Sequence, residues 1–452
     1  MVNPLYLPEL REYLAEHNTA ELKEFCEALH PARTADFMEG LEPAEAWEVL
    51  KHTDLARRVE IFEFFQEELQ VAMMEAVSRA EMAELVAALA PDDRVDLLKQ
   101  VDPAIVDELL PLVPSDDRRD ILHLKSYPEG TAGAVMTTEV AKLDESLTVK
   151  EALDKLQAVA AELETIYYLY VVDAHDHLRG LVSARQLLSA MRTPDVRLGD
   201  LMETGLVTVE VDDDQEEVAQ KVAKYDLVAI PVVDAERKML GIITYDDVID
   251  VVMEEATEDA HRSAAVAPLE NRYLQTSLVT LAWKRGVWLI ILFAAALLTA
   301  FALRHYETDL ERWQWLVFFV PLVISSGGNS GNQSATLVIT GLTAGDIELS
   351  DWFKLTRREI LQGLMLGTFL ALCALVTAPL ISKHPWNTAG AWVVPITILS
   401  VVLCGTLVGA LLPLIFKRMG LDPALMSNPF VAGIIDIVGI VVYMNVAWLL
   451  MM

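Results

Sequence analysis

The amino-acid sequence predicts a multidomain membrane protein with an α-helical superhelical N-domain, a tandem α/β repeat, a connecting helix and a five-span α-helical transmembrane domain. Of its 452 residues, 53% are apolar, and the apolar segments long enough to span a bilayer all lie beyond about residue 283. The charge follows the same division, because the net formal charge is −33 over residues 1–275 and +1 over residues 276–452. An acidic soluble half is therefore followed by a nearly neutral membrane half.

The acidic charge of the soluble half limits the class of partner. Such a surface attracts cations and repels the phosphates of nucleic acid, so DNA and RNA are not expected partners. The three cysteines, Cys26, Cys373 and Cys404, share no metal-ligand spacing. We expect free thiols and a soluble part in the cytosol. Any single acid in this half is explained at least as well by a solvated surface.

Residues 1–130 are predicted to form a helical domain, because short amphipathic segments follow one another there. Prolines recur, mostly at multiples of twelve residues, at Pro31, Pro43, Pro91, Pro103 and Pro114. Proline suits the first turn of a helix, and the apolar i, i+3, i+4 positions of each segment suit a buried face. The expected structure is a small helical superhelix.

Residues 131–255 carry two copies of a longer repeat, which we divide into domains at 131–200 and 201–255. In each copy a helix is followed by a strand, a turn, a second strand and another helix, so that "YYLYVVDAHDHLRGLVSARQLL" corresponds to "LVAIPVVDAERKMLGIITYDDVID". Gly180 of the first copy matches Gly241 of the second. Both copies resemble cystathionine-beta-synthase (CBS) domains. The resemblance implies a regulatory pair that binds adenine nucleotides or ions.

Residues 256–282 are predicted to form a connecting helix that continues the charged stretch "VIDVVMEEATEDAHRS". The spacing of Asp247, Asp250, Glu254 and Glu258 places several carboxylates on one helical face. Like charges at i, i+4 destabilise a helix unless something neutralises them. This face therefore needs a neutralising partner.

Residues 283–452 contain five segments that are long enough to span a bilayer. We place them at about 284–303, 313–340, 360–382, 391–416 and 428–450. Five spans put the two ends of the domain on opposite sides of the membrane. With the acidic half in the cytosol and the C-terminus outside, the inner flanks hold seven Lys and Arg residues and the outer loops three. This asymmetry agrees with the positive-inside rule for a multi-pass protein of the inner (plasma) membrane.

Asp436, in the segment "NPFVAGIIDIVGIVVYM", is the only acid in the interior of a predicted span. A charge at the centre of a bilayer costs about 2.5 to 3.5 kcal/mol on insertion scales, so an unpaired aspartate that faces lipid is disfavoured. No Lys, Arg or His lies in the interior of a span to pair with it. Hydrogen bonding to helix neighbours is the structural alternative. We interpret Asp436 as a cation site in a water-filled path.

The second predicted span carries the irregular stretch "PLVISSGGNSGNQSATLVITG". Gly327 and Gly328, together with Asn329 and Asn332, are expected to interrupt the helix and to bring carbonyl and amide groups to a cavity. Close helix packing explains any single glycine equally well. The amide side chains beside the glycines favour the cavity. The stretch is not a phosphate-binding loop, because no Gly-Lys-Ser/Thr follows it.

The order of these parts resembles the MgtE-type magnesium transporter family over essentially the whole chain. The most specific matches are "GGNSGNQSATLVITGL" in the second span and "DPALMSNPFVAGIIDIVG" in the fifth. The resemblance implies a homodimer with one pore on its two-fold axis, lined by the second and fifth spans, where the aspartate matching Asp436 holds a hydrated Mg²⁺. Asn428, Ala432 and Gly439 match positions near that ion. Few carboxylates with outer amides and carbonyls suit Mg²⁺, because this ion gives up its water reluctantly.

The same resemblance assigns the acidic surplus to gating. It implies that Mg²⁺ ions bridge the helical domain, the CBS pair and the connecting helix, called the plug, and hold the pore closed when cytosolic Mg²⁺ is high. Without ions the like-charged faces are expected to repel each other, and the assembly opens. The matching acids are Glu60, Asp92, Asp96, Asp214, Asp226, Asp247, Asp250, Glu255, Glu258, Asp259 and Asp422.

Two further patterns concern the CBS copies. Thr244 and Asp247 in "GIITYDD" fit the Ser/Thr-x-x-Asp of nucleotide-binding CBS domains, whereas the first copy reads "GLVSARQ", without the aspartate. Two alternatives are open. The pair has one adenine nucleotide site, which binds ATP as a modulator, or it has no occupied nucleotide site. His175 and His177 in "DAHDHLRG" have a ligand-like spacing. They fall in a predicted hairpin turn, so we interpret them as surface residues.

The sequence thus predicts an Mg²⁺-selective channel or transporter that cytosolic Mg²⁺ closes, and not an enzyme. Transport of another divalent cation, such as Co²⁺, is the alternative within this class; the absence of soft ligands near Asp436 argues against softer metals. A CBS-regulated membrane protease would need a His-Glu-x-x-His motif in a span, and the sequence has none. A CBS-regulated membrane sensor without transport is the remaining alternative.

Overall fold

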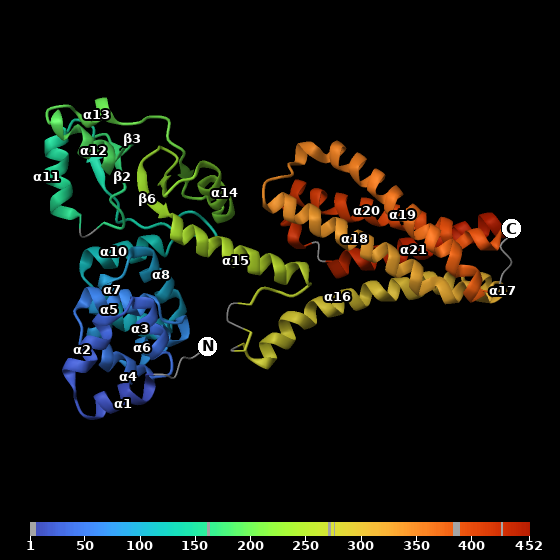
Figure 1. Cartoon of the computed structure of the whole chain (residues 1–452), viewed down its shortest axis with the longest axis horizontal. Coiled ribbons are helices and arrows are strands. Elements are labelled where there is room, and N and C mark those ends of the chain that lie inside the picture. Colours follow the sequence, from blue (N-terminus) through green and yellow to red (C-terminus); the bar gives the residue numbers. More distant parts are fainter. Residues whose placement is uncertain (1–5, 161–162, 270–272, 275, 383–388, 426–427) are drawn as a thin grey trace. The chain divides into compact units, whose positions relative to one another are not determined.

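A computed structural model describes residues 6–160, 163–269, 273–274, 276–382, 389–425 and 428–452 of the chain. The chain divides into two compact units, Met1–Val252 and Met253–Met452. The first holds short helices and two small sheets, and the second holds long apolar helices (Figure 1). The predicted multidomain architecture is confirmed.

Short helices make up the N-terminal part of the first unit. They are α1 (Leu7–Ala15), α2 (Thr19–Ala28), α3 (Pro31–Met38), α4 (Pro43–Leu50), α5 (Leu55–Glu63), α6 (Glu67–Ala76), α7 (Arg79–Ala88), α8 (Pro91–Gln100), α9 (Pro103–Leu109), the 3₁₀ turn η1 (Leu110–Leu112) and α10 (Ser115–Leu124). Proline begins α3, α4, α8 and α9, where a backbone N–H is not needed. Pro114 stands directly before α10. The buried faces of these helices share one core with Ile230 and Ile243 of the CBS region.

Two three-stranded sheets of the same topology follow. The strands are β1 (Lys142–Asp144), β2 (Tyr168–Val172), β3 (Leu178–Ser183), β4 (Val209–Glu210), β5 (Ala229–Val233) and β6 (Met239–Thr244). In each sheet the first two strands are parallel and the last two antiparallel. The register shifts after Val171 in one sheet and after Val232 in the other, and Gly180 and Gly241 lie opposite these two valines. The repeat in the sequence is therefore a structural repeat that includes its irregularities.

The segments that precede the two sheets are exchanged between them. Thr137 forms a bridge with Ile242 of β6, and Glu203 forms one with Leu181 of β3. A Cβ on Gly241 would lie only 2.3 Å from the carbonyl oxygen of Thr137, so glycine is needed for this approach. The helices of this region are α11 (Val149–Val159), α12 (Ala184–Ser189), η2 (Ala190–Arg192), α13 (Leu198–Leu201) and α14 (Gln215–Tyr225).

The hairpin turns of the two sheets pair with each other. The Leu178 N–H donates to the Arg237 carbonyl at 3.0 Å, and the Met239 N–H donates to the Asp176 carbonyl at 2.9 Å. The two CBS copies are therefore tied at their turns as well as through the exchanged segments.

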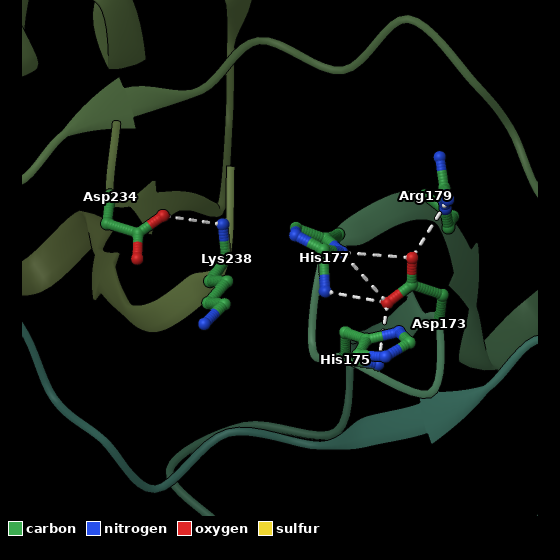
Figure 2. A network of polar contacts seen from close by, with 6 residues as sticks. All are labelled: Asp173, His175, His177, Arg179, Asp234 and Lys238. Carbon is green, nitrogen blue, oxygen red and sulfur yellow. Dashed lines mark hydrogen bonds and ion pairs between the residues drawn. The ribbon is translucent and has the colours of Figure 1, made fainter. Parts of the chain in front are cut away.

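Figure 2 shows how Asp173 holds the first turn. Its carboxylate accepts hydrogen bonds from the backbone N–H groups of His175 at 2.8 Å and His177 at 3.1 Å, and it also contacts the His177 ring and Arg179. Burial would raise the pKa of Asp173, but these partners hold it well below its usual range. Asp234 accepts two backbone hydrogen bonds in the second turn in the same way. The two histidines thus belong to a turn, with His175 exposed and His177 partly buried.

The helix α15 (Tyr245–Ser263) differs in extent from the predicted connecting helix. It begins directly after β6, inside the stretch assigned to the second CBS domain. The described residues from 264 to 277 are not helical, and α16 begins at Leu278. A continuous helix over 256–282 is therefore wrong. The physical reason is local: Ala265 has a positive φ of 58°, and Pro268 follows it without a backbone N–H.

Long helices dominate the second unit. They are α16 (Leu278–His305), α18 (Val320–Thr343), α19 (Trp352–Ser382), α20 (Gly390–Arg418) and α21 (Asn428–Met451), with the short α17 (Glu307–Arg312), η3 (Gln314–Phe319), η4 (Leu349–Asp351) and η5 (Pro423–Leu425) between them. Within the described residues, four stretches are long and apolar enough to cross a membrane: α16, Leu349–Ala378, α20 and α21. The second predicted span corresponds to α18, which is helical but more polar than these four. It can be polar because much of its surface is buried against α20 and α21.

The expected interruption of the second span is wrong, because α18 runs without a break through its glycine cluster. The glycines serve close packing instead. A Cβ on Gly405 of α20 would lie 2.5 Å from the Gly327 carbonyl oxygen, and a Cβ on Gly409 would lie 2.1 Å from that of Gly331. Small residues on both helices therefore let the two backbones touch.

Candidate ion-binding sites

Asp436 lies on a face of α21 that it shares with Ala432 and Asn428, because these residues are four apart. This face is turned toward α18. A Cβ on Gly328 would lie 3.6 Å from the Ala432 Cβ and 3.9 Å from Asp436 Oδ1. The half-buried Asp436 carboxylate makes no hydrogen bond or ion pair with any residue that the structure describes. A cation next to Gly328 would meet this carboxylate directly.

A polar contact between the two helices lies at the N-terminal end of α21, on the same face. Asn428, the first residue of α21, accepts a hydrogen bond from the Thr336 hydroxyl of α18 at 3.2 Å. Asn428 and Asp436 are eight residues apart, which is about 12 Å along a helix. Four predicted residues, Asp436, Ala432, Asn428 and Gly328, therefore lie along one α18–α21 seam.

The other predicted pore residues lie elsewhere. Gly327 and Gly439 are buried in helix packing, since a Cβ on either would meet Val401 of α20, at 2.4 Å and 3.5 Å. Asn329 is exposed and donates a hydrogen bond within its own helix. The Asn332 Oδ1 atom is buried and has no hydrogen-bond partner in the described part of the chain. The structure does not bring these four residues to the Asp436 carboxylate.

An acidic cluster forms in the first unit where α8 approaches the start of α15. Asp92 is only 8% exposed, and its Oδ1 has no hydrogen-bond partner among the described residues. Burial, with the nearby charges of Asp247, Asp93 and Glu164, raises the pKa of Asp92 well above its usual value. Burial also raises the pKa of Asp247, although the Thr244 hydroxyl opposes this shift. Within the described part of the chain, no ion pair joins a carboxylate of this cluster to a Lys or Arg side chain.

Sequence reasoning missed three members of this region. Burial and neighbouring acids raise the pKa of Asp93 to about 6, and they raise the pKa of Glu63 and of Glu164 to about 7. Asp93 stands next to the predicted Asp92, and this position in the sequence could have pointed to it. Glu164 lies in the first CBS copy, and no local pattern connects it to α8.

The remaining predicted acids of the first unit have local partners or open surroundings. Glu60 pairs with Arg57 at 2.9 Å, and Asp96 pairs with Lys99 at 2.8 Å. Asp214 caps the start of α14, while Asp226 ends this helix with a left-handed backbone at φ 51°. Asp250 is exposed on α15. Over the described residues, no three His, Cys, Asp or Glu side chains are arranged so as to hold a metal ion by themselves.

A second acidic group lies at the end of α15 in the second unit. Arg262 forms ion pairs with Glu258, one turn before it, and with Asp422, just ahead of η5. Burial, followed by the charges of Asp422 and Glu255, raises the pKa of Asp259 to about 6. The arginine neutralises part of the like-charged face that the spacing had indicated. Its i+4 spacing from Glu258 was visible in the sequence.

The predicted nucleotide motif forms a compact local structure. The Thr244 hydroxyl at the end of β6 donates to Asp247 at 2.5 Å. In the first copy, Ser183 at the end of β3 makes the same contact with Gln186 at 2.8 Å. The two copies therefore differ here by one charge, because an amide replaces the carboxylate.

Three family models match the chain in the order of its parts. The MgtE intracellular N domain matches residues 29–130, the CBS domain matches 132–193 and 198–254, and MgtE, described as a divalent cation transporter, matches 320–446. Together with the apolar helices, these matches define a multi-pass membrane protein of the transporter class, which is not an enzyme.

Two relatives and a solved structure are also similar. The magnesium transporter MgtE of Thermus thermophilus is 40% identical over 365 residues, which cover 80% of this chain and 79% of that protein. That of Enterococcus faecalis is 33% identical over 337 residues, with 75% and 73% covered. The crystal structure of the cytosolic domain of the Mg²⁺ channel MgtE in complex with ATP is 36% identical with a TM-score of 0.51, covering 54% of this chain and 98% of that one. The chain belongs to the MgtE family, as the sequence motifs predicted.

Proposed function

We propose that this chain is an Mg²⁺-selective channel or transporter, in which Asp436 holds the hydrated ion. The observation that carries the proposal is the half-buried Asp436 carboxylate of α21, which has no cation partner among the described residues. A negative charge at this depth is costly unless a cation passes it. The names of the relatives as magnesium transporters support the same ion.

A second copy of the chain completes the pore. One carboxylate leaves a divalent ion half balanced, whereas two Asp436 side chains that meet on a two-fold axis match its charge. Mg²⁺ keeps several waters, so the Ala432 and Asn428 groups along the α18–α21 seam suit its outer shell. The homodimer lies in the inner membrane, with its acidic domains in the cytosol and its C-termini outside.

Oxygen donors favour hard cations and disfavour soft ones, which supports Mg²⁺ over metals that prefer sulfur or nitrogen. Co²⁺ accepts the same ligands and is the competing cargo. A membrane sensor that does not transport ions is the second candidate function. In such a sensor Asp436 would not conduct a cation.

Cytosolic Mg²⁺ closes the pore by neutralising the acidic clusters. The unpartnered Asp92 carboxylate beside Asp247 is one binding position, and the group of Asp259 and Asp422 is another. When Mg²⁺ is scarce, the like charges repel each other and favour the open state. ATP binds at Thr244 and Asp247 of the second CBS copy as a modulator. The first copy, where Gln186 replaces the acid, has no nucleotide.

Uptake of Mg²⁺ into liposomes that contain the purified full-length chain tests the proposal. Asp436→Asn keeps the size of the side chain and removes its charge. Losing a buried charged partner costs about 2 to 5 kcal/mol, so uptake should fall at least about thirtyfold. Glu311→Gln, which changes an exposed acid in the same way, should leave uptake unchanged. A sensor would show no uptake to lose, and competition with Co²⁺ in the same assay decides the selectivity.

A further inference from the structure

Arg262, near the end of α15, holds two carboxylates together. Its guanidinium forms ion pairs with Glu258, one turn earlier on the same helix, and with Asp422, which lies between α20 and η5. The three side chains are only 27% to 31% exposed. Water and salt therefore screen these pairs less than they screen an ion pair on open surface.

Asp422 connects this contact to the packing of α21. Its second oxygen, Oδ1, accepts a hydrogen bond from the Ala424 N–H in η5 at 2.7 Å. Ala424 is fully buried, and it belongs to the same apolar cluster as Ile435 of α21. Ile435 is the neighbour of Asp436 in the sequence. Asp422 and η5 are therefore held by Arg262 on one side and by the core around α21 on the other.

Arg262 supplies positive charge where α15 would otherwise meet Asp422 with like charges. Burial and three nearby carboxylates raise the pKa of Asp259, and the Arg262 charge opposes this rise. Those carboxylates belong to Asp422, Glu255 and Glu258. Removal of the arginine would leave the like charges to repel each other. The ion pair with Asp422 thus offsets a repulsion between the end of α15 and η5.

The end of α15 is a defined turn, so Arg262 does not lie on a frayed helix end. Ala265 has a positive φ, and its N–H donates to the Arg262 carbonyl at 2.9 Å. The Val266 N–H donates to the His261 carbonyl at 2.9 Å. These two bonds form a Schellman motif, which satisfies the last carbonyls of the helix. A movement of α15 is therefore carried to Arg262.

We propose that Arg262 couples α15 to the pore helix α21. It is a fixed counter-charge that keeps the end of α15 on Asp422 whether or not Mg²⁺ is bound, so that the start of α21 follows α15 when the acidic clusters bind Mg²⁺. A diffusible ion holds carboxylates together only at sufficient concentration, whereas a guanidinium on the chain is always present and always charged. The inference rests on the proposed function, because it concerns how the proposed closure by Mg²⁺ reaches the pore.

Mg²⁺ uptake by full-length chains in liposomes, measured over a range of internal Mg²⁺ concentrations, tests the coupling. Arg262→Gln should leave uptake at low internal Mg²⁺ unchanged. It should raise the internal concentration that half closes the pore about threefold to tenfold, the effect of one lost partner in a partly buried ion pair. Arg262→Lys keeps the charge and should stay within about twofold of the unaltered chain. Arg119→Gln removes an exposed arginine that pairs with Asp116 on α10, and as the matched control it should not change closure.

An unchanged half-closing concentration in Arg262→Gln would overturn the coupling and leave the proposed function intact. A lower one would also overturn it, since Arg262 would then compete with Mg²⁺ for the carboxylates, and an equal rise in Arg262→Lys would overturn the role of the charge. If Arg262→Gln does not fold, Arg262→Met, which keeps the apolar stem, takes its place with the same expectation. Uptake by the unaltered chain that internal Mg²⁺ does not reduce would instead overturn the proposed closure, and absence of uptake would overturn the proposed transport.

Discussion

Asp92 lies in surroundings unlike those of a solvated acid. Its carboxylate is buried, one oxygen has no hydrogen-bond partner among the described residues, and further acids surround it. A charged carboxylate in such a place opposes folding unless a cation or a proton neutralises it. The charged form of Asp92 is thus a source of instability in the Mg²⁺-free chain, and under the proposed function it is a binding group for Mg²⁺.

Acid should stabilise the Mg²⁺-free chain. The raised pKa values of about 6 to 7 for Asp93, Glu63 and Glu164 mean that the folded chain binds more protons than the unfolded chain between about pH 4 and pH 7. Stability is then fully present below the unfolded pKa values and is lost as the pH rises through the folded ones. The melting temperature with a chelator should be higher at about pH 5 than at about pH 7.5.

The variant Asp92→Asn tests the same acidic cluster, because it removes the charge of one carboxylate at every pH. At about pH 7.5 without Mg²⁺ it should melt about 2 to 4 °C higher, the shift that about 1 kcal/mol produces in a domain of 150 to 250 residues. Glu9→Gln on exposed surface is the control and should not change the melting temperature. A melting temperature that is equal at both pH values would contradict the uncompensated cluster.

The one-charge difference between the CBS copies predicts a one-sided response to ATP. Thr244→Val keeps the shape of the side chain and removes the hydroxyl that contacts Asp247. It should weaken ATP binding roughly tenfold, the loss expected for a hydrogen bond to a charged group. Ser183→Ala, the equivalent change in the first copy, should leave ATP binding unchanged in calorimetry of the full-length chain. Equal losses in both variants would place the nucleotide elsewhere.

At the scale of elements, the contact between α18 and α20 depends on the absence of side chains. Gly327 and Gly331 of α18 face Gly405 and Gly409 of α20, so backbone meets backbone. This contact holds α18 in one position beside α21, which carries Asp436. The glycine cluster therefore serves helix packing and does not break α18.

Gly409→Ala tests this packing. Its Cβ would lie 2.1 Å from the Gly331 carbonyl oxygen, so the helices must separate at a cost of about 1 to 3 kcal/mol. The melting temperature in detergent should fall by several degrees, and Mg²⁺ uptake should fall with it. Gly286→Ala on α16 is the control, because a Cβ there meets nothing within 4 Å. Equal stability of the two variants would mean that α20 can shift freely.

At the scale of the whole molecule, the proposed function assigns conduction and closure to different acids. Asp436 belongs to the membrane helices, whereas Asp247, Glu255 and Asp259 belong to α15. Replacing these three together by Asn, Gln and Asn should leave Mg²⁺ uptake in place and remove its closure by high internal Mg²⁺. Mg²⁺ flux into liposomes that already contain Mg²⁺ measures whether the pore still closes.

The control for the triple variant neutralises three exposed acids near α1, Glu9, Glu12 and Glu16, and should keep closure. Protection of α15 from proteolysis by Mg²⁺ should likewise persist in the control and vanish in the triple variant. Closure that survives the triple variant would remove the gating role of α15.

Local patterns predicted much of this protein correctly. Prolines at helix starts, the doubled CBS copy and the apolar segments depend on neighbours in sequence, so they were readable without coordinates. The extent of α15 was misjudged, because the positive φ at Ala265 ends the helix although the charge pattern continues. The break expected in α18 was also wrong, because glycine permits either a break or a close approach, and only the presence of α20 selects between them.

By itself the sequence determined the order of the parts, the membrane class and the isolation of Asp436, because composition and short periodicities carry that information. Only the tertiary structure decided that Asp92 is buried beside Asp247 and that Glu359 meets Ser334 of α18. These are contacts between residues far apart in the chain. Burial, and with it the free-energy cost of a charge, depends on which elements pack together. A local sequence pattern does not predict which elements these are.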